Sequence, residues 1–255
     1  MSRRDEVNGL YKQSQALNSI CHVLFWVNVG LSMLALLPFV TMTNAIVSVQ
    51  ILVSALYIIL KIIDDGCLWY NAEAARRKNN LQVALDLNLS DLETDGYYNN
   101  GEEPSLIKYA VNTFESSYFS KENATRMLIK SFVKACVSVV VLVIIGWISP
   151  RKDFLFVTTQ AVFSAYIIEE AIMLAIYKTK LDKLYNLFYT EFVTVGVSKQ
   201  KQQNLLLSYV VEYEAVKAHY KVRLDSNWFN KHNEQLSSKW EAIKSKIVIR
   251  SKLTR

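Results

Sequence analysis

Four long runs of apolar residues constrain the fold of this chain more than any other feature of its sequence. An α-helix needs about 20 mainly apolar residues to cross a hydrocarbon core about 30 Å thick. Runs of this length occupy residues 21–40, 45–63, 131–149 and 154–177. Buried helices of a large soluble protein are the alternative, but the length and low charge of the runs favour membrane spans.

The spacing of the runs predicts two tight helical hairpins. Only four residues separate the first pair, and the second pair is separated by Pro150, Arg151, Lys152 and Asp153. The composition agrees, because seven Gly and three Pro among 255 residues favour long helices over β-structure. We therefore expect an all-α membrane protein with four transmembrane helices in two hairpins. Cytosolic helical extensions are expected between spans two and three and at the C-terminus.

The polar stretches around the hairpins divide the chain into five predicted parts. They are an N-terminal arm at 1–20, transmembrane hairpin 1 at 21–63, an acidic helix–loop–helix region at 64–128, transmembrane hairpin 2 at 129–177 and a basic helical domain at 178–255. Apolar spacing predicts that the second span continues as a helix beyond Gly66, and that the tail forms helices near 201–222 and 228–249. Ser120 is expected to cap the helix that enters span three.

Charge is distributed unevenly along the chain, whose formal net charge is +6. Residues 64–128 carry six Lys/Arg and eleven Asp/Glu, whereas residues 178–255 carry fifteen and seven. These regions can attract each other within a chain or between subunits, or the basic tail can meet anionic lipid or a phosphate-bearing ligand. Lys and Arg also cluster at one end of each span. That bias predicts cytoplasmic N- and C-termini, although Arg151 and Lys152 oppose this orientation.

Glu169 and Glu170 lie inside the fourth apolar run, where an unpaired carboxylate is costly. At 1.5 Å per residue, Glu169 is about 22 Å from the outer end of the run, which places it in the inner half of the membrane. An ion pair with Lys134 or Lys61, at a similar depth, would neutralise one carboxylate. Because adjacent helical residues point about 100° apart, the other glutamate can face a water-filled path.

Other polar residues within the spans are the candidates for lining such a path. They are Asn28, Gln50 and Gln160, with Ser32, Ser48 and Thr159 nearby. Single polar residues also join neighbouring membrane helices, so each of them has a structural explanation as well. Four spans are too few to enclose a wide pore, and a conducting path is therefore expected to need a homo-oligomer.

The sequence contains no recognisable catalytic or cofactor-binding motif, so we expect a protein that is not an enzyme. The three histidines lack the spacing of metal ligands, and the acidic segment 91–103 lacks the ligand spacing of an EF-hand. No glycine-rich phosphate loop is present. The three cysteines indicate reduced thiols rather than a disulfide framework. We therefore expect neither a metal nor a cofactor.

Three segments of the middle region carry a resemblance to a known family. They are AEAARRKNNLQVALD at 72–86, GYYNN at 96–100 and KYAVNTFESSYFS at 108–120. Together with the layout of arm, hairpins and helical tail, they make the chain similar to bacterial four-transmembrane effectors of SMODS-associated anti-phage defence systems. The resemblance implies a pore-forming protein of the bacterial inner membrane. It implies that infection, sensed directly or through a cyclic nucleotide, makes the protein oligomerise and permeabilise that membrane, which aborts the infection.

Two other functions fit the same sequence. The protein can instead be a membrane-anchored sensor or scaffold whose cytosolic helices recruit a soluble defence protein, or it can be a small ion channel or transporter. Membrane lipid is the expected partner in all three cases, and nothing predicts specific binding of nucleic acid. Replacing Glu169 or Glu170 by Gln separates these functions, because only a functional path would lose conductance while the protein stays folded.

Overall fold

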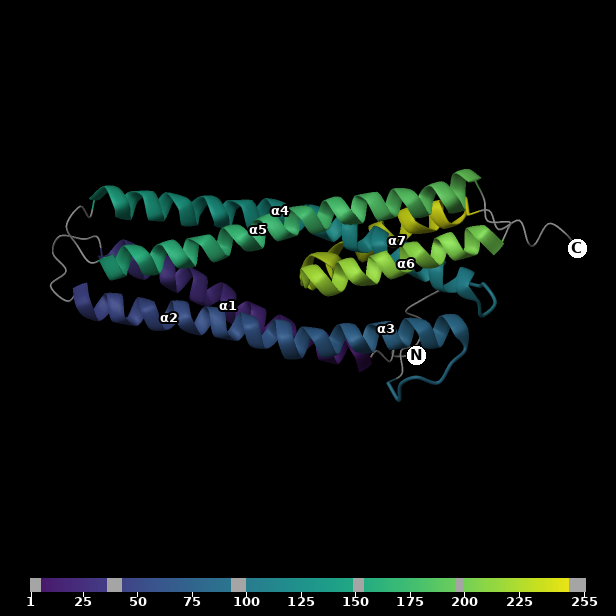
Figure 1. Ribbon diagram of the computed structural model, residues 1–255, viewed down its shortest axis with the longest axis horizontal. Helices are drawn as coiled ribbons and strands as arrows, with labels where there is room; N and C mark the ends of the chain where they lie inside the picture. The colour runs from purple at the N-terminus through teal and green to yellow at the C-terminus, as the bar shows by residue number, and fades with distance from the viewer. Residues whose placement is uncertain (1–5, 36–42, 93–99, 149–153, 196–199, 248–255) are drawn as a thin grey trace, which may run out of the picture. The chain divides into compact units, whose positions relative to one another are not determined.

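The computed structural model describes residues 6–35, 43–92, 100–148, 154–195 and 200–247, and the regular elements in these ranges are all helices (Figure 1). In chain order they are α1 (Glu6–Ala35), α2 (Thr43–Ile63), η1 (Asp64–Leu68), α3 (Trp69–Leu85), α4 (Leu106–Ile148), α5 (Phe154–Tyr189), η2 (Thr190–Val195), α6 (Gln200–Tyr220) and α7 (Ser226–Lys244). The elements η1 and η2 have the wider turns of a π-helix. The all-helical prediction is confirmed for the described residues.

Four helices are long and apolar enough to cross a membrane, which indicates a multi-pass membrane protein. They are α1, the helix that α2 begins, α4 and α5, and each of them contains the described part of one of the four apolar runs. The helices extend beyond the runs, because α1 begins at Glu6 and α5 continues to Tyr189. The predicted tail helices are confirmed as α6 and α7.

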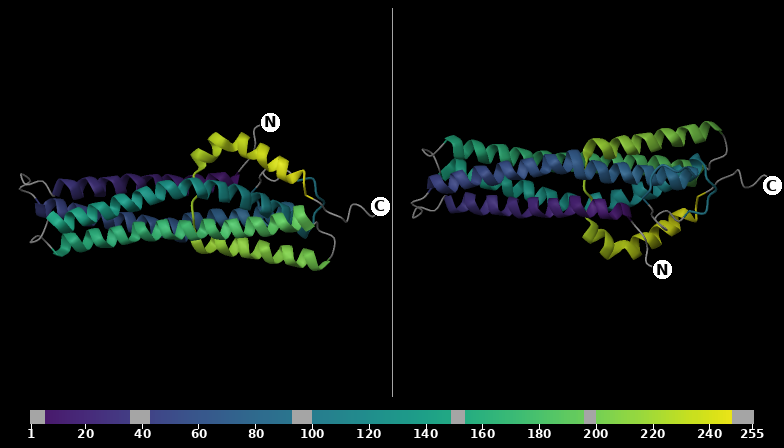
Figure 2. Two further views of the ribbon diagram at one scale, coloured as in Figure 1. Left: turned by 90° about the horizontal axis from the view of Figure 1, so that it is seen from above. Right: turned by 90° about the horizontal axis from the view of Figure 1, so that it is seen from below.

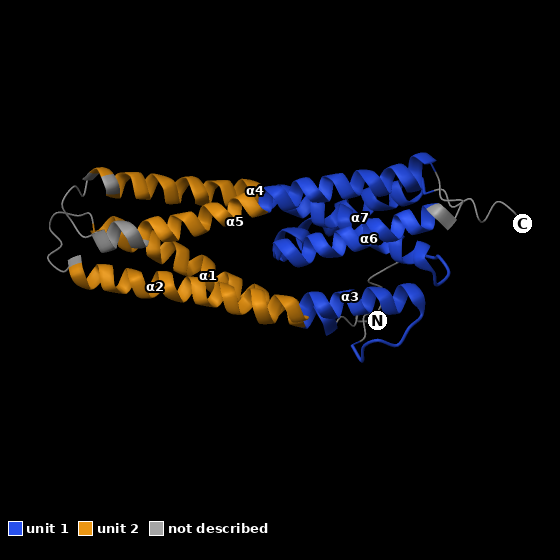
Figure 3. Cartoon of the chain, viewed as in Figure 1, with its two compact units in different colours: residues 1–9, 72–127, 174–255 blue, residues 10–71, 128–173 orange. Residues whose placement is uncertain are grey.

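The chain divides into two compact units, which Figure 3 colours separately. Unit 1 comprises Met1–Gly9, Ala72–Met127 and Leu174–Arg255, and unit 2 comprises Leu10–Asn71 and Leu128–Met173. The predicted hairpin at 21–63 falls wholly in unit 2, and the hairpin at 129–177 does so except for its last four residues. Each unit has its own core.

Unit 2 is a bundle of four helices, formed by α1, α2 and the adjoining parts of α4 and α5, which run side by side in Figures 1 and 2. Its core contains Cys21, Phe25, Tyr57, Ala135, Phe163, Ile167 and Ala171, and a second cluster contains Val47, Val141 and Ile145. Large apolar side chains also point outward, as Val23 (62 % exposed) and Leu52 (68 % exposed) illustrate. Apolar residues on both the inner and outer faces are what a membrane-embedded helix requires.

Unit 1 has an aromatic core centred on Phe114 of α4. The Phe114 ring stacks on Phe188 and Phe192, with centroid separations of 5.8 Å in both cases, and meets Trp240 of α7 edge-on at 5.1 Å. Such aromatic pairs contribute about 0.5–1.5 kcal/mol beyond the area they bury. The core therefore fixes α7 against α4 and α5 within unit 1.

Local side-chain hydrogen bonds define the helix ends in unit 1. Ser105 precedes α4, and its hydroxyl accepts a hydrogen bond from the Lys108 amide at 3.2 Å. Asp225 caps α7 by accepting from the Trp228 amide at 3.0 Å, and the side chain of Asn123 both donates to and accepts from the Asp225 backbone. Asp86, which has a positive φ of 54°, follows the last residue of α3 in the left-handed conformation that commonly ends a helix.

The predicted helix cap at Ser120 is wrong. Helix α4 runs from Leu106 to Ile148 without interruption, so Ser120 lies in its interior. The Ser120 hydroxyl is buried and lies 3.3 Å from the hydroxyl of Tyr213 in α6. The backbone amides of α4 at this position already bond within the helix, and the serine serves a tertiary contact instead.

Replacing Phe114 by Ala should destabilise unit 1 by about 3–5 kcal/mol, because it removes a fully buried ring and leaves a cavity. Thermal unfolding of the purified protein in detergent, followed by circular dichroism, should show a lower midpoint. The matched control is Val211→Ala on the outer surface of α6, where the valine is 60 % exposed and the midpoint should stay near that of the wild type. Equal midpoints for the two variants would contradict the assigned core.

Candidate functional site

A layer of buried amides and hydroxyls crosses the core of unit 2. We call it the amide layer, and it consists of Asn28, Ser32, Gln50, Ser54, Ser138, Gln160 and Ser164. The Gln50 amide donates to Gln160 Oε1 at 3.0 Å and to the Ser32 hydroxyl at 2.9 Å. The amide of Asn28 donates to the Ser54 hydroxyl at 2.6 Å. These bonds connect α1, α2 and α5, so three of the predicted path residues are brought together.

The serines extend the amide layer to the fourth helix. Ser138 of α4 donates its hydroxyl proton to Ser164 of α5 at 2.9 Å, and the Gln160 amide lies 3.4 Å from the same Ser164 oxygen. Two buried carbonyl oxygens in the layer, Asn28 Oδ1 and Gln50 Oε1, accept no hydrogen bond from the described residues. The layer therefore holds more acceptor capacity than its helix-to-helix bonds use.

A second polar layer, the charged layer, lies farther along the same helices and consists of Asn18, Lys61 and Glu170. Lys61 Nζ lies 2.8 Å from Glu170 Oε1 and donates to Asn18 Oδ1 at 3.0 Å. The Tyr57 hydroxyl donates to the other oxygen of Glu170 at 3.0 Å. One of the pairings that the sequence suggested is thus present, and it neutralises the inward-facing glutamate.

An aromatic layer separates the amide layer from the charged layer. The Phe163 ring lies 5.9 Å from Phe25 in a stacked arrangement and 5.3 Å from Tyr57 edge-on. All three rings are essentially buried, and they meet where α1, α2 and α5 adjoin. On α5 the order Gln160, Phe163, Glu170 places the rings between the two polar layers. The interior of the bundle is therefore polar on both sides of one layer of packed aromatic rings.

The remaining predicted site residues lie outside these two polar layers. Lys134 Nζ is 5.2 Å from the centroid of the Phe25 ring, which is a cation–π arrangement. Among the described residues Lys134 forms no ion pair with either glutamate. Glu169 is exposed on the outer face of α5, and it makes no hydrogen bond or ion pair in the described part of the chain. Ser48 bonds only to the Asn44 carbonyl in its own helix, and the side chain of Thr159 is outside the described residues.

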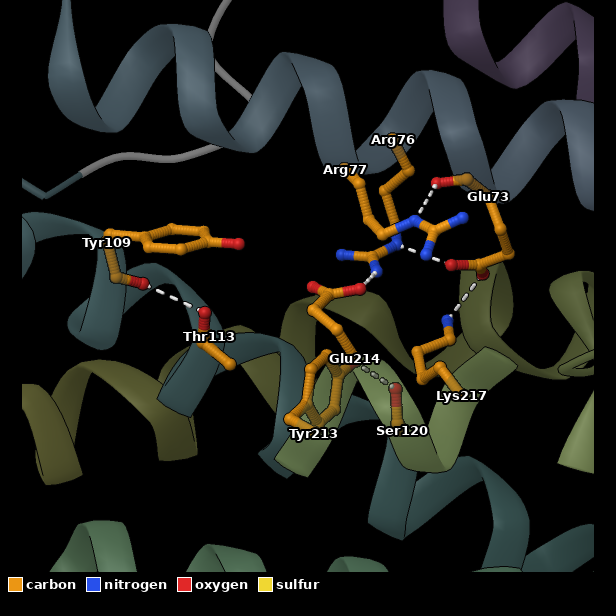
Figure 4. Close-up of polar contacts among 9 residues, drawn as sticks. All are labelled: Glu73, Arg76, Arg77, Tyr109, Thr113, Ser120, Tyr213, Glu214 and Lys217. Atoms are coloured by element: carbon orange, nitrogen blue, oxygen red, sulfur yellow. Dashed lines mark hydrogen bonds and ion pairs between the residues drawn. The ribbon is translucent and has the colours of Figure 1, made fainter. Parts of the chain in front are cut away.

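Unit 1 contains a buried ion-pair network that joins α3 to α6 (Figure 4). Glu73 of α3 accepts from Arg76 Nε at 2.7 Å and from Lys217 Nζ of α6 at 2.6 Å. Arg76 also pairs with Glu214 of α6. Each helix thus contributes one acid and one base, and Glu73, Arg76 and Lys217 are all less than 9 % exposed.

The surroundings of Glu73 hold it in the ionised form. Burial raises the pKa of this carboxyl, but the positive charges of Arg76 and Lys217 and their hydrogen bonds outweigh burial and bring the pKa to about 2. Burial likewise raises the pKa of the Tyr213 hydroxyl, so this residue stays a neutral hydrogen-bonding group beside Ser120. The Arg76 guanidinium lies 5.8 Å from the centroid of the Tyr213 ring.

A chain of buried amides continues the polar interior of unit 1 from α3 to α4. Asn112 donates to Asn80 Oδ1 at 2.9 Å, and Asn100 donates in turn to Asn112 Oδ1. The Glu102 amide donates to Asn100 Oδ1 at 3.2 Å, which ties the segment before α4 to this chain. The polar residues between α3, α4 and α6 therefore specify one packing of these helices.

The ion-pair network cannot be identified as a site from the sequence alone. Its signal was present, because Glu73 with Arg76 and Glu214 with Lys217 are spaced three residues apart in predicted helices, which places each pair on one face. The spacing does not show that these two faces meet. That information lies in the tertiary packing of α3 against α6.

The fold and these sites define the protein as an all-helical, multi-pass membrane protein with buried polar networks in both units. No known protein family, curated protein or solved structure matches the chain.

Replacing Lys61 by Met should destabilise unit 2 by about 3–5 kcal/mol, because it leaves the Glu170 carboxylate inside the fourth apolar run without its counter-charge. The double variant Lys61→Met/Glu170→Met removes both charges and should recover most of this loss. Thermal unfolding in detergent measures both effects. The control is Glu169→Gln, which alters the adjacent but outward-facing carboxylate and should change the midpoint little in detergent. A double variant no more stable than Lys61→Met would show that Glu170 does not depend on Lys61.

The stability of unit 1 should fall in acid because of Glu73. Its folded-state pKa of about 2 lies below the ordinary value of 4.5, so its contribution is complete above pH 4.5 and disappears as the pH falls towards 2. At neutral pH this contribution is roughly 3 kcal/mol.

Thermal unfolding at pH 7, 4.5 and 2.5 tests this expectation. The difference between wild type and Glu73→Gln should be largest at pH 7 and small at pH 2.5. Glu212→Gln, which changes an exposed carboxylate on α6, is the control and should follow the wild type at every pH. A wild-type advantage over Glu73→Gln that is independent of pH would refute the role assigned to this carboxylate.

Proposed function

We propose that the protein is a membrane effector of a bacterial anti-phage defence system, held in a closed state that is opened to permeabilise the inner membrane. The observation that supports this function best is the aromatic layer between the amide layer and the charged layer. Hydrophobic constrictions between hydrated segments close channels because water does not wet them. A small displacement of the helices that carry Phe25, Tyr57 and Phe163 would join the two polar layers.

The composition of the two layers supports a path rather than helix association alone. Hydrogen bonds between the spans require only pairs of polar residues, whereas unit 2 buries an amide layer drawn from all four helices. The unused carbonyl oxygens of Asn28 and Gln50 can receive water or a cation once the constriction widens. The Lys61–Glu170 pair then marks one end of the path.

The bacterial defence role and the inner-membrane location are supported by the sequence rather than by the polar and aromatic layers. The defence role follows from the resemblance of the segments at 72–86, 96–100 and 108–120 to SMODS-associated membrane effectors. The bias of Lys and Arg supports an inner-membrane orientation with both termini and the helical regions of unit 1 in the cytoplasm. A cyclic nucleotide or a soluble defence protein would act on the cytoplasmic side, and a homo-oligomer would widen the path.

A membrane-anchored sensor or scaffold is the second candidate, and the ion-pair network of unit 1 favours it. A buried network of ion pairs holds α6 to α3, and α3 follows α2 and η1 without an intervening loop. A partner that displaces α6 would have to break charge pairs in a dry interior, which makes the response all-or-none. In that case the four spans serve only as an anchor.

Replacing Phe163 by Ser tests the closed-gate proposal. The variant removes the central ring of the aromatic layer and should depolarise cells that express it without any phage. In proteoliposomes ion efflux should rise about tenfold or more, which corresponds to a barrier lowered by about 1.4 kcal/mol. Membrane potential in cells and efflux from proteoliposomes are the two measurements.

Two control variants accompany this test. Phe163→Leu keeps the constriction apolar and should remain closed, and Phe132→Ser makes the same exchange at an outward-facing ring that is 54 % exposed. If Phe163→Ser is well expressed and yet as tight as Phe132→Ser, the gate is excluded and the anchored sensor becomes the better explanation. Wild-type depolarisation during phage infection would support the defence setting separately.

A further inference from the structure

The outward-facing carboxylate of Glu169 is a charged group within the fourth apolar run that the bundle of unit 2 leaves without a partner among the described residues. The same face of α5 carries Val162, Ala165 and Ile172, of which Val162 and Ile172 are more than half exposed. Glu169 makes no hydrogen bond or ion pair in the described structure. An otherwise apolar membrane-facing surface therefore carries an unneutralised charge.

The position of Glu169 on α5 keeps its carboxylate away from water. It follows the start of α5 by about 22 Å in a hydrocarbon core about 30 Å thick. The Cα–Cβ bond of a helical residue is tilted towards the helix N-terminus, and for Glu169 this direction leads deeper into the membrane. A glutamate has a short side chain, so a partner from another molecule is needed at this depth.

A hydrogen-bond donor, the side chain of His22, is exposed at the same level along the helices of unit 2. Cys21, Tyr57 and Ala171 belong to one buried cluster, and Tyr57 bonds to Glu170. His22 follows Cys21 and points outward, as Glu169 does beside Glu170. His22 is on α1 and Glu169 is on α5, so the two residues are on different helices of the bundle. A histidine N–H donates to a carboxylate whether or not the ring is protonated.

The outer face of α1 suits close packing against another helix. Val23, Val27 and Leu34 are exposed along its centre, and a side chain placed at Gly30 would meet no atom within 4 Å. His22 and Trp26 lie at one edge of this exposed face, because His22 is about 100° around the helix from Val23. On α1 the residues from Val23 to Leu34, through Val27 and Gly30, follow one another at spacings of four, three and four residues. On α5 the spacings from Val162 to Ile172, through Ala165 and Glu169, are three, four and three residues. Faces with this alternation interlock in membrane helix pairs, and glycine lets the backbones approach.

Lys130 on α4 is the alternative cation on the outer surface, but its position fits the interface region of a bilayer instead. It precedes Lys134 by one helical turn, about 6 Å nearer the end of the span. A lysine placed there extends its ammonium group to water and lipid phosphate. His22 is therefore the donor that matches the depth of Glu169.

We propose that the Glu169 face of α5 binds the His22 face of α1 in a second copy of this chain. Because the two faces differ, each copy binds one neighbour through its Glu169 face and another neighbour through its His22 face. Such head-to-tail contacts build a ring or a chain rather than a symmetric dimer. This interface deepens the proposed function, on which it rests for its membrane setting, since it would join subunits whose bundles each carry the proposed path.

Crosslinking in membranes tests the interface directly. Two differently tagged copies are co-expressed in a background with Cys21→Ala, Cys67→Ser and Cys136→Ser, one carrying Glu169→Cys and the other His22→Cys. A short bifunctional methanethiosulfonate should join the two tags in membranes. The matched control replaces His22→Cys by Ile59→Cys, which places a thiol on the exposed face of α2, where Ile59 is 52 % exposed. This pairing should give at most a tenth of the product, as expected for random encounters.

Three results would overturn the proposal: equal crosslinking of Glu169→Cys to both partners, crosslinking of Glu169→Cys only to itself, or no product from correctly inserted protein. A charge swap provides a second measurement. Glu169→Lys should lower the fraction of oligomer seen by native mass spectrometry from nanodiscs, and adding His22→Glu should restore it. Neither readout involves conductance, so a failed interface is distinguishable from a failed gate in Phe163→Ser.

Discussion

The ion pair between Lys61 and Glu170 is the interaction on which the membrane bundle most depends. Lipid offers no hydrogen bonds, so a carboxylate and an ammonium group inside the spans are tolerable only when they meet each other. At 2.8 Å they do, and Asn18 and Tyr57 add one further hydrogen bond to Lys61 and to Glu170, respectively. This arrangement fixes the register of α1, α2 and α5 together, which in turn aligns the aromatic layer and the amide layer.

The same requirement to pair buried charges shapes unit 1. Glu73 lies in the acidic middle region and Lys217 in the basic tail, so their pairing is the one that the net charges of these regions would favour. Arg76 and Glu214 also pair, although here the base lies in the acidic region and the acid lies in the basic tail. Bulk charge therefore does not explain how α6 recognises α3. The position of each charged group along the helix does, and a displaced register would leave buried charges unpaired.

The sequence was sufficient to predict the four spans and the tail helices, because apolar length and helical periodicity are local properties. It also limited the partners of the intramembrane glutamates to two lysines. It could not select Glu170 over Glu169, since that choice depends on how α5 is rotated against α2. Ser120 was misassigned for a related reason: its side chain resembles a helix cap until Tyr213, 93 residues later, is seen to be its partner. Both the choice of Glu170 and the role of Ser120 depend on contacts between segments that are far apart in the sequence.

The ion-pair network of unit 1 has an evolutionary consequence. Each of its charges is balanced by another within the same dry interior, so a single substitution at Glu73, Arg76, Glu214 or Lys217 leaves an orphaned charge. A lineage can leave this arrangement only by losing a whole pair or by exchanging acid and base together. Descendants of this chain should therefore differ at these four positions in concert, and those pairs of changes would record the contact between α3 and α6 in sequence alone.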